Sequence, residues 1–307
     1  MIISASRRTD IPAFYSEWFL RRLTEGRFLV PHPKVPGRLG LVQVSPENLD
    51  CIMFWTKNPA PMQDKLKVID QLGYLYYFSF TLTAYGPEKE KHLPPKNEII
   101  GTFQRLADRI GPTRVDWRFD PIMVDKTHSS AWHLERFGEL CRQLQGYTNR
   151  CIINFVKSYR HLGGAVREMD DSDIQKLASG LAKVAAEHRL PIFNCTERWN
   201  LKAEGLEFSA CIDRQKIESL VGGPIRARKD PGQPRICRCL ESVDIGVYNT
   251  CVHGCLYCYA VTDPGQAQRK LAAHDPEAPM LTGYPEGGEI VNDRTKPSLR
   301  DGQNRLF

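Results

Sequence analysis

The sequence has no apolar run long enough to cross a lipid bilayer. Its most apolar stretch, residues 74–82, is far shorter than the roughly 20 residues that a membrane helix needs, and is typical of a buried strand. No basic leader precedes an apolar segment at the N-terminus, so no export signal is expected. Internal repeats and low-complexity tracts are also missing, which argues against a solenoid. These absences favour a cytoplasmic globular protein without a membrane partner.

The excess of positive charge is small as well. Lys and Arg number 42 against 36 Asp and Glu, which gives a net charge of +6 over 307 residues. This balance permits a nucleic-acid partner without requiring one, and a mildly basic solvated surface is the simpler interpretation. The densest basic run, residues 226–229, is short. With 41% hydrophobic and 25% charged residues, the composition is that of a folded protein of one or two domains.

Short β-rich runs alternate with amphipathic runs along the chain. Strands are predicted at residues 2–6, 51–55, 75–83, 114–119, 151–156, 192–196 and 243–248. Helices are predicted at residues 14–25, 62–72, 98–110, 131–144, 171–188 and 214–221. This alternation predicts an α/β fold of about six to eight parallel strands that form a partial or full (β/α) barrel. We expect residues 1–275 to make this single domain and residues 276–307 to form an irregular tail.

Polar residues follow almost every predicted strand. In a β/α barrel the carboxyl ends of the strands converge on one face, and active sites form there. A shared site is therefore expected at that face. Three residues just past or within the strand ends, Lys57, Arg118 and Glu197, are candidates for contacts with a cofactor or substrate.

Cysteine, in contrast, is abundant. The chain has ten, and five of them fall within residues 237–258. In a reducing compartment, clustered cysteines are more often metal ligands than disulfide partners. The cysteines at positions 51, 141 and 151 lie in or beside apolar runs and are expected in the core.

Cys251, Cys255 and Cys258 form a C-x3-C-x2-C motif, and an aromatic residue, Tyr257, precedes the last cysteine. Three thiolates on one short loop can ligate three irons of a [4Fe–4S] cluster. The fourth iron then has no protein ligand and is open to a small molecule. The motif therefore favours an iron–sulfur cluster with one open coordination site.

Zinc is the main alternative at this loop, because a fourth ligand could come from His253, Cys237 or Cys239. The last two, together with Cys195 and Cys211, could instead build a second site, either an auxiliary [4Fe–4S] cluster or a zinc site. The irregular spacing of these four cysteines does not distinguish the two metals, so both interpretations stay open.

The cysteine loop resembles the signature of radical S-adenosylmethionine (radical SAM) proteins, and the chain as a whole resembles the bacterial family called domain of unknown function 1848. The second resemblance is carried by residues 4–12, 54–59, 117–122, 237–239 and 244–246 and by the cysteine loop. The radical SAM resemblance implies that the open iron binds SAM through its amino and carboxylate groups. Electron transfer then breaks the sulfonium C–S bond, and the 5′-deoxyadenosyl radical abstracts hydrogen. Neither resemblance implies a substrate.

The chain departs from ordinary radical SAM proteins in the position of the loop. There the loop follows the first barrel strand, whereas here it follows the last predicted strand, residues 243–248. A circular permutation would reconcile the two, since chain termini often lie close together. We therefore expect residues 243–248 to lie beside residues 2–6, with residues 262–273 as the helix that follows.

Under this permutation, residues 6–10 take the part that the end of the second strand has in holding the methionine moiety of SAM. Arg7 or Arg8 could pair with its carboxylate, and Asp10 could accept from its amino group. Ser6 and Tyr257 are included as candidates beside them. The alternative is that the arginines are surface charges and that Asp10 caps the helix beginning near residue 12.

The leading hypothesis is thus an enzyme that reductively cleaves SAM and is reduced by a partner such as flavodoxin or ferredoxin. A small molecule or peptide is favoured as its substrate over nucleic acid. The alternative is a non-catalytic zinc or iron–sulfur protein, associated with nucleic acid through its basic balance.

Overall fold

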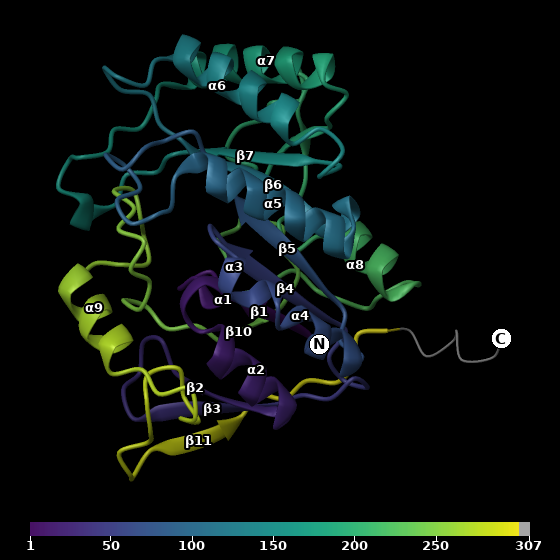
Figure 1. Ribbon diagram of the computed structural model, residues 1–307, viewed down its shortest axis with the longest axis vertical. Coiled ribbons are helices and arrows are strands. Elements are labelled where there is room, and N and C mark those ends of the chain that lie inside the picture. Colours follow the sequence, from purple (N-terminus) through teal and green to yellow (C-terminus); the bar gives the residue numbers. More distant parts are fainter. Residues whose placement is uncertain (301–307) are drawn as a thin grey trace.

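The computed structural model describes residues 1–300 as an α/β fold around one eight-stranded sheet (Figure 1). The strands, in spatial order, are β10 (Val243–Asp244), β1 (Ile2–Ala5), β4 (Cys51–Thr56), β5 (Tyr76–Thr81), β6 (Val115–Ile122), β7 (Cys151–Phe155), β8 (Ile192–Asn194) and β9 (Glu207–Phe208). All neighbouring pairs are parallel. Within residues 1–300 no pairing joins β9 to β10, so the sheet is open and the barrel is partial.

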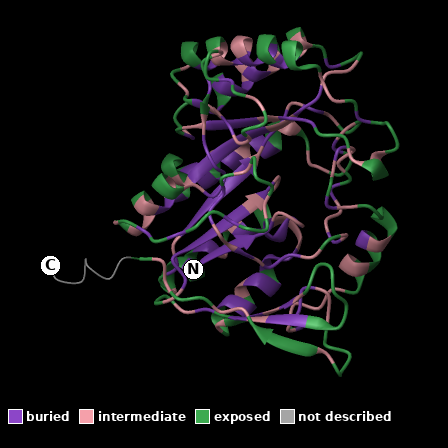
Figure 2. Ribbon diagram, turned by 180° about the vertical axis from the view of Figure 1, so that it is seen from behind, coloured by how far each residue is buried: buried purple, intermediate pink, exposed green. Residues whose placement is uncertain are grey.

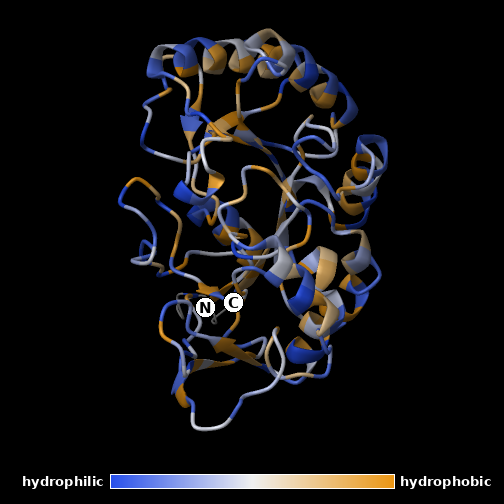
Figure 3. Ribbon diagram, turned by 90° about the vertical axis from the view of Figure 1, so that its left-hand side faces the viewer, coloured by the Kyte–Doolittle hydropathy of each residue, from blue (hydrophilic) through white to orange (hydrophobic). Residues whose placement is uncertain are grey.

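Helices follow most of the strands, as the alternating pattern predicts. They are α1 (Ile11–Phe14), α2 (Ser16–Thr24), α3 (Ala60–Gln63), α4 (Leu66–Gln71), α5 (Lys96–Ile110), α6 (Ser130–Gln143), α7 (Asp171–Glu187), α8 (Arg214–Val221) and α9 (Pro264–Ala272). The longer ones are amphipathic, with hydrophobic and hydrophilic residues alternating along each helix (Figure 3). In α5, for example, Ile99, Phe103 and Leu106 recur at helical spacing and are buried.

Alternate residues of the strands pack into two different layers, because successive side chains of a strand point to opposite faces. In β4, Ile52 and Phe54 belong to the large core beneath the helices, whereas Cys51 and Met53 belong to a smaller cluster on the other face. Figure 2 shows the central strands of the large sheet buried and the outer faces of the helices exposed. The second face also carries polar side chains, including the fully buried Ser4, and the candidate site is built on it.

A second, three-stranded sheet lies at the end of the molecule opposite α6 and α7 (Figure 1). It consists of β11 (Ile290–Asp293), β3 (Arg38–Gln43) and β2 (Arg27–Pro31). The segment expected to be an irregular tail therefore contains a strand, because β11 pairs in parallel with β3; residues 301–307 lie outside the described residues. In the described part of the chain, no helix is long and apolar enough to span a membrane.

Candidate functional site

The first and last strands of the large sheet in chain order are neighbours, as the permuted arrangement predicts. Ile3 of β1 pairs with Val243 of β10, and Ser4 pairs with Asp244. Strand β10 ends at Asp244 and is therefore shorter than the strand predicted at residues 243–248. The cysteine loop therefore leaves the sheet at the carboxyl end of β10, directly beside the end of β1.

The Asp244 carboxylate ties these two strand ends together. It accepts four hydrogen bonds, from Ser4 Oγ at 2.9 Å, Ser6 Oγ at 2.6 Å, the Arg7 amide at 2.9 Å and the Gly246 amide at 3.0 Å. A β-carbon at Gly246 would lie 2.0 Å from Ser6 Oγ, which no side chain could accommodate. This close approach requires glycine at position 246.

The connection between β5 and α5 holds the cysteine loop in place. The Leu256 amide donates to the Lys89 carbonyl at 2.8 Å, and the His92 amide donates to the His253 carbonyl at 2.9 Å. Between these two bonds the loop turns through Gly254, which has a φ of +68°. A β-carbon there would lie 3.0 Å from the His92 ring and 3.2 Å from the Lys91 β-carbon.

Replacing Gly254 with alanine is expected to lower the free energy of unfolding by about 2 kcal/mol, because backbone strain in the left-handed region and crowding against His92 add. Gly163 is the matched control. It has a φ of +56° and nothing within 4 Å of its virtual β-carbon. Gly163→Ala should therefore show the backbone cost alone, about 1 kcal/mol. Urea unfolding of both variants measures the difference. Equal losses of unfolding free energy in the two variants would contradict crowding of Gly254 against His92.

The thiols of the cysteine loop are close enough to influence one another. Burial raises the pKa of Cys251, Cys255 and Cys258, that of Cys255 to about 12, and the neighbouring cysteines of the loop add to the rise at Cys251 and Cys255. The Ala260 amide donates to Cys258 Sγ at 3.4 Å. Thiolates in this setting need a nearby positive charge, which a metal centre supplies. Across residues 1–300, no group of three or more His, Cys, Asp or Glu side chains is arranged to hold a metal ion as it stands.

A buried carboxylate, that of Glu90, contacts the cysteine loop through Tyr257. It is only 2% exposed and accepts from Lys57 Nζ at 2.7 Å and Thr83 Oγ1 at 2.7 Å, and also from Lys96 Nζ and the Tyr257 hydroxyl. Burial alone would raise the pKa of Glu90, but the two lysines outweigh it and lower the pKa to about 2. Glu90 therefore carries a full negative charge between two ammonium groups.

This network brings two of the sequence-predicted candidates together, Lys57 and Tyr257 of the cysteine loop. The Lys57 ammonium lies 5.4 Å from the centre of the Tyr257 ring. Burial alone would lower the pKa of Lys57, but Glu90 and then the Cys255 thiol outweigh it and raise the pKa. Glu90 itself was missed by sequence reasoning. It lies in a charged stretch, residues 88–92, that is typical of a solvated loop.

Asp10 joins the start of α1 to the cysteine loop. Its Oδ1 accepts from the Ala13 amide at 3.0 Å, so it caps the helix. Its Oδ2 accepts from the Lys57 amide at 2.7 Å and lies 2.8 Å from His253 Nε2. Both carboxylate oxygens of Asp10 thus have partners within the protein, and a contact with the SAM amino group remains a prediction.

The two neighbouring arginines point in different directions. Arg8 donates to the Gly246 carbonyl at 3.2 Å and its guanidinium lies 5.3 Å from the centre of the Tyr248 ring, on the side of the cysteine loop. Arg7 instead lies 5.1 Å from the centre of the Trp55 ring and 3.9 Å from Asp230. Of the two, Arg8 is the one that faces the segment between β10 and the cysteine loop.

The remaining candidates lie around the second group of cysteines. Arg118 donates to Cys211 Sγ at 2.7 Å and to Cys195 Sγ at 3.7 Å. Glu197 forms an ion pair with Arg238. The structure thus divides the predicted residues into two groups, one at the cysteine loop and one around the second group of cysteines.

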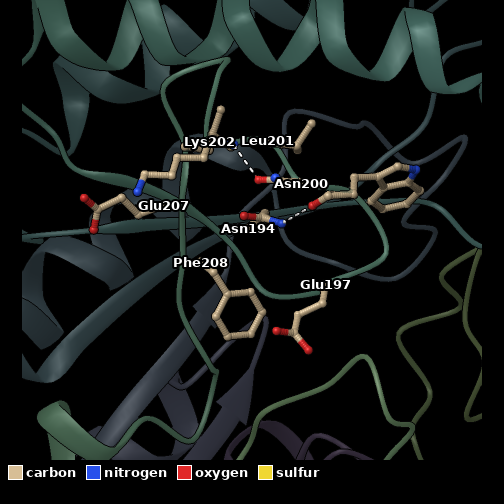
Figure 4. A pocket seen from close by; sticks show the side chains of 9 residues that line it. Asn194, Glu197, Asn200, Leu201, Lys202, Glu207 and Phe208 are labelled. Atoms are coloured by element: carbon tan, nitrogen blue, oxygen red, sulfur yellow. Dashed lines mark hydrogen bonds between the residues drawn. The ribbon is translucent and has the colours of Figure 1, made fainter.

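A cavity of about 520 Å³ opens beside this second group, at the carboxyl ends of β8 and β9 (Figure 4). Glu197 and the Phe208 ring lie on one side of it, and Lys202 and Asn200 lie on the other. Asn194 crosses between them and donates to the Trp199 carbonyl at 3.2 Å. The cavity mixes aromatic and charged side chains at the end of the sheet where ligands of parallel sheets bind.

Comparison with known proteins gives the family. The model of the family described as "Domain of unknown function (DUF1848)" matches residues 2–260. These residues include the ends of β1 and β10 and the whole cysteine loop. The chain belongs to the DUF1848 family. This match confirms the family resemblance seen in the sequence; the radical SAM resemblance stays a prediction.

Outside the DUF1848 family, the comparisons add little. No curated protein matches the chain. Among solved structures, a protein from Bacteroides thetaiotaomicron that is described as an alpha-L-fucosidase is similar at 8% sequence identity, with a TM-score of 0.27 over 56% of this chain and 72% of that chain. A similarity at this level carries no argument about function.

Proposed function

We propose that this chain is a radical SAM iron–sulfur enzyme whose cluster is held by Cys251, Cys255 and Cys258. One observation carries the proposal: the three-cysteine loop leaves the sheet at the carboxyl end of β10, and β10 pairs in parallel with β1. This is the edge of a parallel sheet at which cofactors bind. It is also where the permuted order of strands requires the loop to be.

The donor set fits a [4Fe–4S] cluster. Three thiols project from one loop, and burial disfavours their charged forms unless a cation neutralises them. When bound, the cluster supplies the electron that breaks the sulfonium C–S bond of SAM, leaving methionine and a 5′-deoxyadenosyl radical. The electron comes from a reductant, for which flavodoxin or ferredoxin is the expected class.

The protein side chains orient and shield this reaction. Arg8 is the proposed partner of the SAM carboxylate, because its guanidinium faces Gly246 and Tyr248 at the start of the loop. The buried network around Glu90 keeps the loop rigid from the opposite side. The substrate is proposed to be a small molecule or peptide that reaches the carboxyl ends of the strands.

The test is formation of 5′-deoxyadenosine. The full chain is purified without oxygen, reconstituted with iron and sulfide, and reduced with dithionite in the presence of SAM. We expect deoxyadenosine from the wild type and only assay background from Cys255→Ala, which also loses about four irons per chain. Cys141→Ala, which removes a buried thiol of α6, is the matched control and should retain both.

A spectroscopic test for SAM on the cluster guards against slow cleavage without substrate. A reduced wild-type protein that binds a cluster yet shows neither deoxyadenosine nor SAM on its iron would overturn the proposal. Zinc in place of iron at this loop would favour the alternative, a non-catalytic metal-binding protein.

A further inference from the structure

A second group of thiols lies on the face of the sheet opposite the large helix-covered core. Cys195 follows β8, Cys211 lies between β9 and α8, and Cys237 and Cys239 precede β10. All four belong to, or pack against, the small hydrophobic cluster on that face. None of them is required by the proposed chemistry of the cysteine loop.

Backbone hydrogen bonds bring these segments together. The Glu197 amide donates to the Ile236 carbonyl at 2.9 Å, which joins the strand end after β8 to the segment before Cys237. The Leu240 amide donates to the Ile212 carbonyl at 3.0 Å. Each of these bonds lies within two residues of a cysteine on both sides, so the thiols meet because the main chain is paired around them.

Side-chain contacts support the same grouping. The Arg118 guanidinium donates to Cys211 Sγ at 2.7 Å and to Cys195 Sγ at 3.7 Å. Cys211 and Cys239 are buried in the small hydrophobic cluster, and Cys195 and Cys237 pack against it. Four cysteines gathered in one buried cluster form an unusual arrangement for side chains that serve packing alone.

Two buried cations face the group. Burial alone would lower the pKa of Arg118, but the thiol of Cys211 and the Asp120 carboxylate outweigh it and raise the pKa. Arg7 lies near Cys239, and its buried Nη2 finds no hydrogen-bond partner within residues 1–300. Both guanidinium groups stack over Trp55, at 5.1 and 5.5 Å from its ring centre. Acidic partners share part of this charge, since Arg118 also pairs with Asp120.

We propose that Cys195, Cys211, Cys237 and Cys239 form a closed tetrathiolate metal centre that takes one zinc ion. Zinc binds four thiolates as a tetrahedron with bonds of about 2.3 Å, which places the sulfurs ~3.8 Å apart. Two of the four sulfurs, those of Cys211 and Cys195, already lie close enough to contact one guanidinium group, that of Arg118. A four-iron cluster would separate its ligand sulfurs further, because an iron–sulfide core lies between them. The thiols must still rotate to close around an ion, because within residues 1–300 no three such side chains are arranged to hold one as they stand.

The charges also agree with this assignment. Four thiolates and one Zn²⁺ carry a net charge of −2, and the two guanidinium groups beside them offset the part of that charge that their acidic partners leave uncompensated. Binding zinc releases the thiol protons to solvent and involves no change of oxidation state. The centre would fix Arg238, which lies between two of its ligands, and Glu197, which pairs with Arg238 and lines the cavity.

The experiment measures zinc and iron per chain in the full-length protein, purified without oxygen. We expect about one zinc in the wild type and in Cys255→Ala, and a loss of at least about tenfold in Cys211→Ser, whereas Cys141→Ser keeps it. Because Cys255→Ala removes the proposed cluster but not the zinc, failure of this assignment is distinguishable from failure of the radical SAM proposal.

A second measurement on the wild type covers the case in which Cys211→Ser does not fold. Titration with a mercurial should release the zinc in step with modification of its ligand thiols, and cobalt should replace it with the visible absorption of a tetrahedral thiolate site. Disulfides among the four cysteines, or four free thiols without metal, would overturn the proposal. Iron that survives in Cys255→Ala and disappears in Cys211→Ser would overturn the assignment to zinc.

Discussion

Glu90→Gln is expected to lower the free energy of unfolding by about 3–5 kcal/mol, the usual cost of removing one partner from a buried charge network. The carboxylate is almost fully buried and forms ion pairs with two ammonium groups, those of Lys57 and Lys96. Burial already lowers the pKa of Lys96, and Glu90 only partly offsets it. Without the carboxylate, both lysines must lose their protons or draw water into the site.

Glu88 is the matched control for this substitution. It lies two residues away in the same connection, is half exposed, and lies 3.4 Å from His128. Glu88→Gln should change the free energy of unfolding by less than about 1 kcal/mol. Urea unfolding at neutral pH measures both variants. Equal stability of Glu90→Gln and wild type would show that the buried charges have no stabilising role.

Asp244→Ala is expected to cost about 3 kcal/mol or more. The change removes a charged acceptor of four hydrogen bonds, and it leaves the hydroxyls of Ser4 and Ser6 and two amides without that partner. Because Asp244 ties β10 to β1, the cysteine loop should also lose its anchor, and the reconstituted protein should retain less iron.

Ser242→Ala provides the comparison for Asp244→Ala. Ser242 lies two residues earlier and accepts one long hydrogen bond, from Arg7 at 3.4 Å. Its removal should cost less than about 1 kcal/mol. Iron content and urea unfolding are measured on both variants. An Asp244→Ala protein as stable and as rich in iron as Ser242→Ala would refute the anchoring role.

Much of the large sheet was predictable because its strands follow a strong local pattern. Alternating β-rich and amphipathic runs gave seven of its eight strands, each within a few residues except for β10. The eighth, β9, is only two residues long and has no pattern of its own. The small sheet was also missed, since β11 pairs with β3 across some 250 residues and its residues are exposed.

The candidate site shows the same division. Cysteine spacing identified the loop, and counting the remaining cysteines gave the second group, which the structure gathers around one hydrophobic cluster. The sequence could not distinguish the roles of Arg7 and Arg8, because the direction of each side chain depends on the fold. Arg7 lies against Trp55, whereas Arg8 lies against Tyr248. Glu90 could not be predicted from the sequence because it lies in a charged segment of the kind usually found at the surface. Only in the folded chain do Lys57, Lys96 and Tyr257 surround it.

The pairing of β1 with β10 has a consequence for synthesis on the ribosome. Ile3 and Val243 are 240 positions apart, so at roughly 5–20 residues per second β1 waits about 12–48 s for its neighbour to emerge. During that time one edge of β1 has no strand to pair with, and such edges invite pairing with other chains. The cysteine loop is translated only after this wait. Any factor that shields this edge of β1 during translation is therefore expected to raise the yield of folded protein.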